Sequence, residues 1–276
     1  MDFTMFIGII LATALMIYGM GIPNLGNFFD VQSIVIVLIG TLATLFSGYG
    51  IKAFKQVPKH IKLIMAKDKF NAQDCIAQIV EMAQIARKKG LLALEEESKK
   101  IEDPFFKQSL ILIVDVPDAS RIKEMLENEL LYLDERHAKS VNFYETGEAL
   151  APAFGMIGTL IGLVNMLKSM SMDSGGSSDI GQNMSVALIT TLYGVIMANI
   201  MFGPIVRRLK QRHDEEILYK NIIIEGVLAI QAGDNPKFLN EKLTSYLAHH
   251  ERADGGGGEE GAEKAPKGKK GKKSKE

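Results

Sequence analysis

Residues 149–170 read ALAPAFGMIGTLIGLVNMLKSM, and residues 184–204 read MSVALITTLYGVIMANIMFGP. A short link rich in glycine and serine, residues 171–183, separates these two apolar segments. Each segment is long enough to cross a bilayer as a helix, because about 20 residues at about 1.5 Å rise match a hydrocarbon core of about 30 Å. The pair therefore predicts two membrane-spanning helices that are close in the sequence.

Small residues recur along one face of each segment. In the first segment they are Ala151, Gly155, Gly158 and Gly162, and in the second they are Ala187, Thr191, Gly194 and Ala198. Spacings of three and four keep such residues on a single helical face. In lipid, faces of this kind favour close helix packing, because van der Waals contact replaces the hydrophobic effect there. Two ordinary anchors packed against each other would show the same pattern.

Threonines and prolines add features that plain anchors do not need. Thr159 lies beside the glycine face and Thr191 lies on the alanine face, so their hydroxyls would point at whatever these faces contact. Each hydroxyl can also bond back to its own helix, as threonine often does. Pro152 and Pro204 bracket the pair, and each would free a backbone carbonyl or bend a helix near a membrane boundary.

Two further apolar segments come earlier, at about residues 3–22 and 33–49, and the only charge between them is Asp30. Basic residues follow the second and fourth segments: Lys52, Lys55, Lys59 and Lys62, and then Arg207, Arg208, Lys210 and Arg212. The positive-inside rule then places both termini and the long middle region in the cytoplasm. The first segment has neither a basic start nor a small-residue cleavage site, so we interpret it as a retained helix.

These patterns predict an all-α membrane protein with four transmembrane helices. A helical cytoplasmic domain is inserted between helices 2 and 3, and a cytoplasmic C-terminal helix follows helix 4. The predicted parts are residues 1–51 (helices 1 and 2), 52–147 (cytoplasmic domain), 148–206 (helices 3 and 4), 207–252 (C-terminal helices) and 253–276 (tail). The tail is rich in Gly, Lys and Glu without apolar periodicity, and we expect it to be disordered.

Within the middle region, apolar residues at helical spacing follow Asn71, and Gly90 offers a stop. A third helix is predicted to start at Asp103-Pro104, after a second one over residues 91–100. Asp118, followed by residues 121–134, is expected to open a long helix, and we predict that this helix continues without a break into the third membrane segment.

The composition and motifs argue against several classes of protein. The 276 residues carry 32 basic and 33 acidic side chains, so no global basic surface indicates nucleic-acid binding. No phosphate-binding glycine loop, nucleophile elbow or histidine pair with metal-ligand spacing is present, so we predict no enzyme activity, no metal site and no cofactor. The single Cys75 excludes an internal disulfide and fits a small buried hydrophobic residue.

Ion movement is a different possibility. It usually requires an ionisable group within the membrane, yet no predicted span has a carboxylate near its centre. Asp30 would stand at the outer mouth, and Glu145 and Glu148 at the inner one. If this chain helps an ion across, a partner chain should supply the carboxylate, with Thr159, Thr191 and Asn199 as polar lining.

Two charge clusters flank the predicted stop at Gly90. Residues 86–90 read ARKKG and residues 94–97 read LEEE. On two helices hinged at Gly90 they could form a mixed-charge docking surface, although a solvated face with local salt bridges would have the same sequence.

The quoted segments at 151–163 and 187–194 closely resemble the A subunit of the bacterial flagellar motor stator, the MotA/PomA family. Residues 80–96 are similar to the family's rotor-contacting segment, and LDERH at 133–137 also resembles the family. The resemblance covers about residues 1–248 and leaves the tail without a counterpart.

This resemblance implies an inner-membrane complex in which five copies of the chain surround two copies of a MotB/PomB-type B subunit. The B subunit's helix would carry the ion-binding Asp. Arg87 and Glu95 would meet the rotor protein FliG, with Lys88 and Glu96 beside them. The position of Ser98 is acidic in some sodium-type members, so that part of the contact differs here.

The resemblance also assigns membrane residues. It implies an ion path at Thr159, Thr191 and Asp30, conformational coupling at Pro152 and Pro204, and packing on the partner. The packing glycines are Gly155, Gly158, Gly162 and Gly194. The transported cation would be Na⁺ or H⁺, and Thr159 with Asp30 favours sodium slightly.

Two alternatives remain open at this point. An energiser subunit of the ExbB/TolQ type also surrounds a partner's Asp-bearing helix, but such proteins typically have three spans. A plain membrane adaptor would only anchor the cytoplasmic domain.

Overall fold

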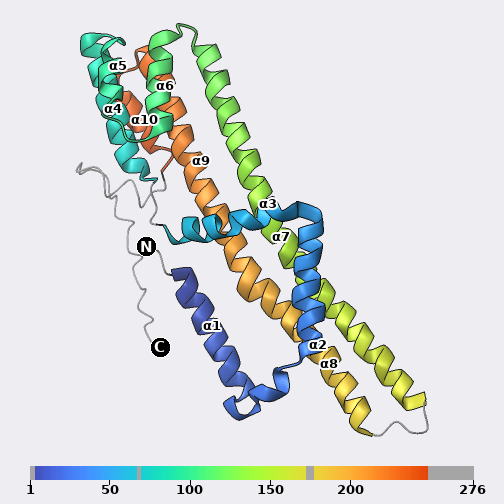
Figure 1. Ribbon diagram of the computed structural model, residues 1–276. Helices are drawn as coiled ribbons and strands as arrows, with labels where there is room; N and C mark the ends of the chain where they lie inside the picture. The colour runs from blue at the N-terminus through green and yellow to red at the C-terminus, as the bar shows by residue number, and fades with distance from the viewer. Residues whose placement is uncertain (1–3, 67–69, 172–176, 248–276) are drawn as a thin grey trace, which may run out of the picture.

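The computed structural model describes residues 4–66, 70–171 and 177–247, and all regular structure in this part is helical. Its axis is a pair of long helical rods that run side by side (Figure 1). One rod is α7, Ala119–Ser171, and the other is α8 (Ser177–Ile196) continued by the π-helix η3 (Met197–Phe202) and α9 (Gly203–Ala232). The predicted all-helical class is confirmed, and the predicted unbroken passage of α7 into the apolar segment is confirmed as well. The predicted tail, residues 253–276, lies outside the described residues.

Three described helical stretches are long and apolar enough to cross a membrane: Val31–Met65, Ala119–Met170 and Ile180–Ala232. A fourth candidate is α1 (Thr4–Met20) together with the 3-10 helix η1 (Ile22–Phe28), which are bent by 94°. At about 1.5 Å per residue α1 alone spans about 26 Å, slightly less than the bilayer core. Three spans are thus supported by length and composition, and the fourth depends on this bent pair.

The second apolar segment forms α2 (Val31–Ile34), the π-helix η2 (Val35–Ile39) and the first part of α3 (Gly40–Met65). Asp30 caps α2 and accepts a hydrogen bond from the Ser33 amide at 2.7 Å. Inside α3 the backbone turns at Gly50, whose φ of 66° and ψ of 178° only glycine adopts readily. Residues 51–65 therefore cross α7 and α9 at a steep angle (Figure 1).

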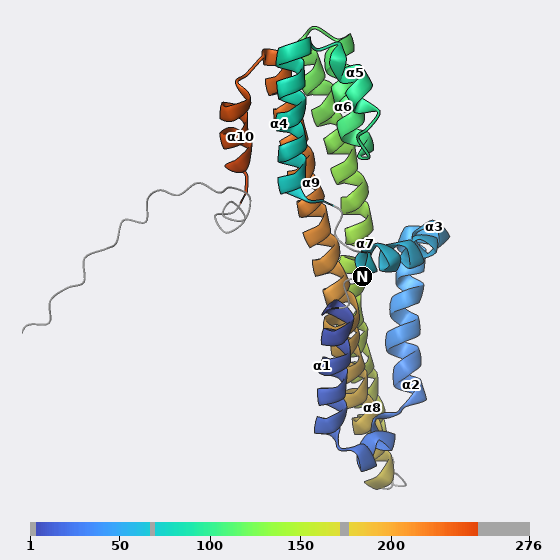
Figure 2. The same ribbon diagram turned by 90° about the vertical axis from the view of Figure 1, so that its left-hand side faces the viewer.

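Four shorter helices gather around the first turns of α7 and the last turns of α9 (Figures 1 and 2). They are α4 (Ala72–Lys89), α5 (Ala93–Ser98), α6 (Pro104–Asp115) and α10 (Pro236–Thr244). Their apolar faces share one core that contains Ile79, Leu94, Phe106, Leu110 and Ile223, all fully or almost fully buried. Burial of this contiguous core is the main force that holds the short helices to α9.

Local signals in the sequence set the ends of these short helices. The Asn71 side chain accepts hydrogen bonds from the amides of Gln73 and Asp74 at the start of α4, and Gly90, with φ 85°, ends the helix. Asp103 caps α6 through the amide of Phe106 at 2.8 Å, with Pro104 as the first helical residue. The predicted starts at Asn71 and Asp103-Pro104 and the stop at Gly90 are confirmed.

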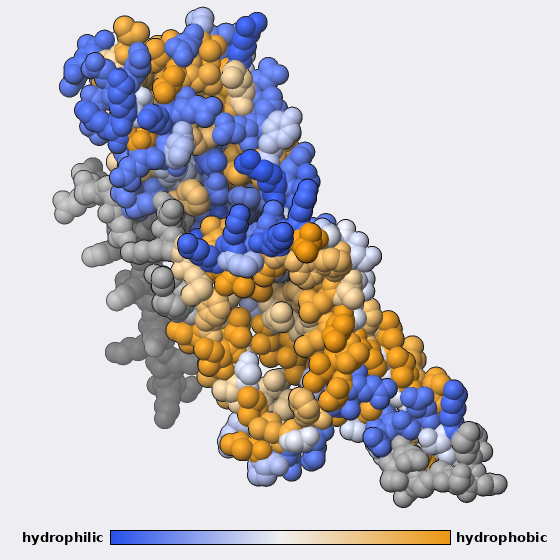
Figure 3. Space-filling view, viewed as in Figure 1, coloured by the Kyte–Doolittle hydropathy of each residue, from blue (hydrophilic) through white to orange (hydrophobic). Residues whose placement is uncertain are grey.

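The surface is divided in the same way as the fold. On the face drawn in Figure 3, hydrophobic residues dominate the half that holds α1, α2 and α8, whereas hydrophilic residues dominate the end with α4, α5 and α6. Many large side chains on the hydrophobic half are more than half exposed, among them Ile10, Leu15, Leu160 and Leu188. Soluble monomers rarely expose so many large apolar side chains together, so this half is suited to lipid or to further membrane helices.

Candidate functional site

Glycines bring α7 and α8 into backbone contact. A Cβ atom at Gly155 would lie 3.1 Å from the Thr190 carbonyl oxygen, and one at Gly162 would lie 2.7 Å from the Asn183 carbonyl oxygen. From the other side, a Cβ at Gly194 would lie 2.7 Å from the Ala151 carbonyl oxygen. These glycines are buried between the two helices of one chain.

This arrangement differs from the predicted packing of these glycines on a partner. At Gly155, Gly158, Gly162 and Gly194 the missing side chain would point at the neighbouring helix of the same chain. A stripe of small residues shows that some helix comes close, but it does not identify that helix. Contact of these glycines with a partner stays a prediction.

The two threonine hydroxyls meet at the edge of this interface. The Oγ1 atoms of Thr159 and Thr191 lie 2.5 Å apart. Each hydroxyl also lies near a helix carbonyl: Thr159 near the oxygens of Gly155 and Ala187, both at 3.1 Å, and Thr191 near that of Ala187 at 3.3 Å. A hydroxyl has one proton and two lone pairs, so this pair keeps lone pairs available. Because Thr191 is exposed, the oxygen pair is open on one side.

Thr190 was not singled out from the sequence, although it belongs to the same interface. Its side chain is fully buried, and its hydroxyl donates toward the carbonyl oxygens of Val186 and Ala187, at 2.9 and 3.0 Å. It fills the space that Gly158 leaves, where a Cβ would come within 2.4 Å of its methyl group. The adjacent threonines at 190 and 191 were the sequence signal for this buried hydroxyl. Neighbouring residues of a helix point in different directions, so when Thr191 lies on the open edge, Thr190 must lie elsewhere.

The two prolines lie where the helices change. Pro152 is inside α7, and its Cα would be 3.2 Å from a Cβ at Gly194. Pro204 is in the first turn of α9, directly after the π-helix η3. Proline has no amide proton to bond to the carbonyl four residues earlier, and a wide π turn beside it is a common adjustment at functional positions. The Phe202 ring closes this turn onto Gly147, where a Cβ would lie 2.6 Å from the ring.

Asp30 is placed differently from the two threonines. Besides the Ser33 amide it accepts the Ser33 hydroxyl at 2.5 Å, so its carboxylate serves as a helix cap. Among the residues that the structure describes, no hydrogen bond joins Asp30 to Thr159 or Thr191. The suggested role of Asp30 in an ion path stays a prediction.

The predicted docking charges lie on both sides of the Gly90 turn, at the hydrophilic end of the molecule. Arg87, Lys88, Glu95 and Glu96 are all exposed. Within the described parts of the chain none of the four forms an ion pair, so the local salt bridges considered from sequence do not occupy them. Leu94 of α5 is fully buried, and this anchors the helix so that the side chains of Glu95 and Glu96 point outward. Ser98 is buried as well, and its hydroxyl donates to the Glu95 carbonyl at 2.8 Å.

Between these two regions, polar pairs connect α7 to α9. Lys210 Nζ lies 2.5 Å from Glu145 Oε1, and the carboxylate raises the pKa of the lysine. His137 and His213 face each other with 3.0 Å between their Nδ1 atoms, and His213 Nε2 lies 3.0 Å from Asp134 Oδ1. Desolvation lowers the pKa of His137, although Glu216 opposes the shift. No local sequence pattern indicates this histidine contact, because its two residues are 76 positions apart.

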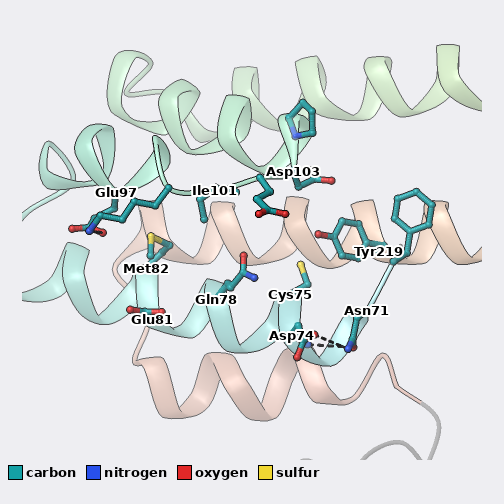
Figure 4. Close-up of a pocket in the computed structure, with 14 residues that line it drawn as sticks. Asn71, Asp74, Cys75, Gln78, Glu81, Met82, Glu97, Ile101, Asp103 and Tyr219 are labelled. Carbon is teal, nitrogen blue, oxygen red and sulfur yellow. Dashed lines mark hydrogen bonds and ion pairs between the residues drawn. The ribbon is translucent and has the colours of Figure 1, made fainter. Parts of the chain in front are cut away.

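A pocket of about 860 Å³ opens between α4, the segment after α5, and α9 (Figure 4). Cys75 and Tyr219 lie inside it, with Asp74 and Asp103 near them. Burial raises the pKa of the Cys75 thiol to about 12, so the sulfur stays protonated at neutral pH and cannot act as a thiolate nucleophile. The described residues include no group of three or more His, Cys, Asp or Glu arranged to hold a metal ion. The predicted burial of Cys75 is confirmed.

Comparison with known proteins agrees with this arrangement. Residues 97–221 match a family model described as the MotA/TolQ/ExbB proton channel family. Motility protein A of Borreliella burgdorferi is 42% identical over 83% of this chain and 87% of its own length. Chemotaxis protein PomA of Vibrio alginolyticus is 39% identical over 92% of this chain and 98% of its own length.

A solved structure shows the same fold over nearly the whole chain. The flagellar MotAB stator complex from Bacillus subtilis contains a chain that is 28% identical, with a TM-score of 0.81, and the match covers 92% of this chain and 99% of that one. Identity above a third across most of the length of two relatives, together with this shared fold, settles the family. The chain belongs to the motility protein A family, within the MotA/TolQ/ExbB proton channel family.

Proposed function

We propose that this chain is the A subunit of a flagellar motor stator, in which cation flow across the inner membrane generates torque on the rotor. The observation that carries the proposal is the likeness, over nine tenths of the chain, to a solved flagellar MotAB stator complex. The chain itself supplies two surfaces such a machine needs: a pair of hydroxyls at an open edge of the apolar helices, and exposed charges at the other end of the molecule.

The topology that we propose has four crossings, with α1 as the first and both termini in the cytoplasm. The lysines after residue 51 and the basic residues after Pro204 support this orientation, because both groups come directly after apolar segments. The short helices α4, α5, α6 and α10 would then form the cytoplasmic domain.

The partner would be a MotB-type B subunit whose helix lies along the open edge of α7 and α8. The apolar segments of this chain contain no carboxylate, so an ion-binding Asp would come from that helix. Thr159 and Thr191 would then line the path and offer oxygen lone pairs to Na⁺ or H⁺. We favour sodium, with the proton as the alternative, and five copies of this chain around two B subunits.

Coupling to the rotor would use the continuity of α7. At 100 mV one elementary charge crossing the membrane carries about 2.3 kcal/mol, enough to drive a modest step if leakage is prevented. A rotation at the level of Pro152 and Pro204 would be transmitted along α7 and α9 to the charges around Gly90. Arg87, Lys88, Glu95 and Glu96 would there push against FliG.

Charge reversal at Arg87 tests the rotor contact. In a stator-deficient flagellated host supplied with this chain and its B subunit, Arg87→Glu should leave co-purification of the two subunits intact and reduce stall torque. Lys237→Glu, at an exposed lysine on α10, is the matched control and should leave torque unchanged. Undiminished torque in Arg87→Glu would remove the rotor role of this surface.

The energiser alternative of the ExbB/TolQ type is less well supported. The family model covers those proteins too. Two relatives that match more than four fifths of this chain, however, are named for motility and chemotaxis. Rescue of an energiser mutant, without rescue of swimming, would favour the alternative.

A further inference from the structure

The second part of α3, residues 51–65, begins after the turn at Gly50. This stretch runs across the rods where the hydrophobic surface gives way to the hydrophilic one (Figures 1 and 3). Such a position, at a large angle to the membrane segments, is the one that an interfacial helix takes in a bilayer.

Side-chain contacts fix this stretch to the rods. The Phe54 ring packs edge-on against Phe143, with 5.3 Å between ring centroids. His60 Nδ1 lies 3.0 Å from the Tyr144 hydroxyl, and Val57 and the fully buried Ile64 belong to the same apolar cluster. At the end of the helix, Arg212 of α9 donates a hydrogen bond to the Ala66 carbonyl. The helix is therefore held in one orientation, and its outer face is presented without further ordering.

That outer face carries a row of lysines. Lys52, Lys55, Lys59 and Lys62 are spaced by three, four and three, which places them on one side of the helix, roughly opposite Phe54 and Ile64. All four are exposed. In the described residues none of them has a carboxylate within ion-pair distance. Four aligned cations without counter-charges repel one another, so they favour an anionic partner.

Exposed apolar side chains lie next to the lysine row. Ile51 is 56% exposed and Leu63 is 47% exposed, and at 100° per residue both lie between the lysines and the face that packs on α7. Hydrocarbon can cover these side chains while the lysine stems run along it and the ammonium groups reach the phosphates. One helix thus combines an apolar sector with a cationic one.

We propose that residues 51–65 form a binding surface for anionic phospholipid headgroups of the cytoplasmic leaflet, with Lys52, Lys55, Lys59 and Lys62 as the phosphate-binding residues. Phosphatidylglycerol, whose headgroup carries a net negative charge, should be bound in preference to zwitterionic phosphatidylcholine. A basic residue near an anionic surface contributes about a fivefold gain in binding, which is about 1 kcal/mol. This inference rests on the proposed topology, but its test does not use motor rotation, so the two can fail separately.

The test counts the lipids that the protein retains. Full-length protein in an uncharged detergent is equilibrated with equal amounts of phosphatidylglycerol and phosphatidylcholine, and lipids that remain after gel filtration are quantified by mass spectrometry. We expect phosphatidylglycerol to be enriched at low salt. In the variant with all four lysines changed to Gln, the ratio of retained phosphatidylglycerol to phosphatidylcholine should fall by at least about fivefold. Equal retention of both lipids by the unmodified protein, or unchanged enrichment in the variant, would overturn the proposal.

Two further variants separate charge from folding and from position. Changing the same four lysines to Arg keeps the charge and should keep the enrichment; its loss in a folded protein would count against simple headgroup attraction. The matched control changes Lys99, Lys123, Lys139 and Lys237 to Gln, which removes four exposed charges elsewhere, and should have no effect. Displacement of the lipid by inorganic phosphate, beyond that by sodium chloride of equal ionic strength, would mean that the row binds a soluble anion and would also refute the proposal.

Discussion

Gly194→Ala is the change that most directly tests the backbone packing of α7 on α8. The new Cβ would lie 2.7 Å from the Ala151 carbonyl oxygen and 3.2 Å from the Pro152 Cα, whereas ordinary contact begins at 3.4 Å. Both neighbours are backbone atoms, so no change of rotamer relieves the overlap. The two helices must therefore move apart by about 0.7 Å at this point.

The expected cost follows from this displacement. Overpacking of a tight interface costs about 1–3 kcal/mol, and a gap of this size forfeits a quarter to a half of each affected dispersion contact. Alanine recovers about 0.5–1 kcal/mol as the better helix former. We expect a net loss of about 1–2 kcal/mol, which corresponds to about 2–4 °C in Tm for each kcal/mol in a chain of this size.

The assay is thermal unfolding of the full chain in detergent, followed by circular dichroism because the chain contains no Trp. Gly48→Ala and Gly181→Ala are the matched controls, since a Cβ at either position meets nothing within 4 Å. Both controls should keep or slightly raise the Tm. A Gly194→Ala protein that melts at or above the Tm of the unmodified chain would refute the packing argument.

Three other predictions concern parts of the chain outside the glycine interface. Gly50→Ala should destabilise the fold by about 1–3 kcal/mol, because φ 66° with ψ 178° is strained for any other residue, and an unchanged Tm would contradict the turn. Desolvation lowers the pKa of His137 below its ordinary value of about 6.5, so the unfolded chain takes up the proton first and stability falls as pH drops below that value. His137→Gln should flatten this decline in pH-dependent melting, and an equally steep decline would rule out His137 as its source. The Cys75 thiol, with a pKa raised to about 12, should react with maleimide only after unfolding, and rapid labelling of the folded chain would disprove its burial.

Much of the local structure could be predicted from the sequence because single residues control it. Asn71 and Asp103 cap helices through their own side chains, and Gly90 ends a helix through a positive φ. The unbroken α7 follows from a helical pattern without a stop. Thr159 lies beside one small-residue face and Thr191 lies on the other, so the two hydroxyls meet once these faces pack together.

Features that depend on contacts between distant segments could not be predicted in this way. The glycine stripe indicates a close neighbour, but the neighbour proved to be the adjacent helix of the same chain. The π-helix η3 and the turn at Gly50 arise where packing overrides helix propensity, and glycine or proline marks only their vicinity. The pairing of His137 with His213 needs the rods to be aligned first, which no local pattern specifies.

The central claim is that this chain converts cation flow into rotation, and tethered-cell rotation tests it most directly. A stator-deficient host, whose rotor accepts foreign stators, would express this chain with its B subunit while external sodium is varied at fixed membrane potential. The account predicts restored rotation that speeds up with sodium, or, for the proton alternative, rotation that a protonophore stops. Cells that assemble the intact complex and still do not rotate would contradict it.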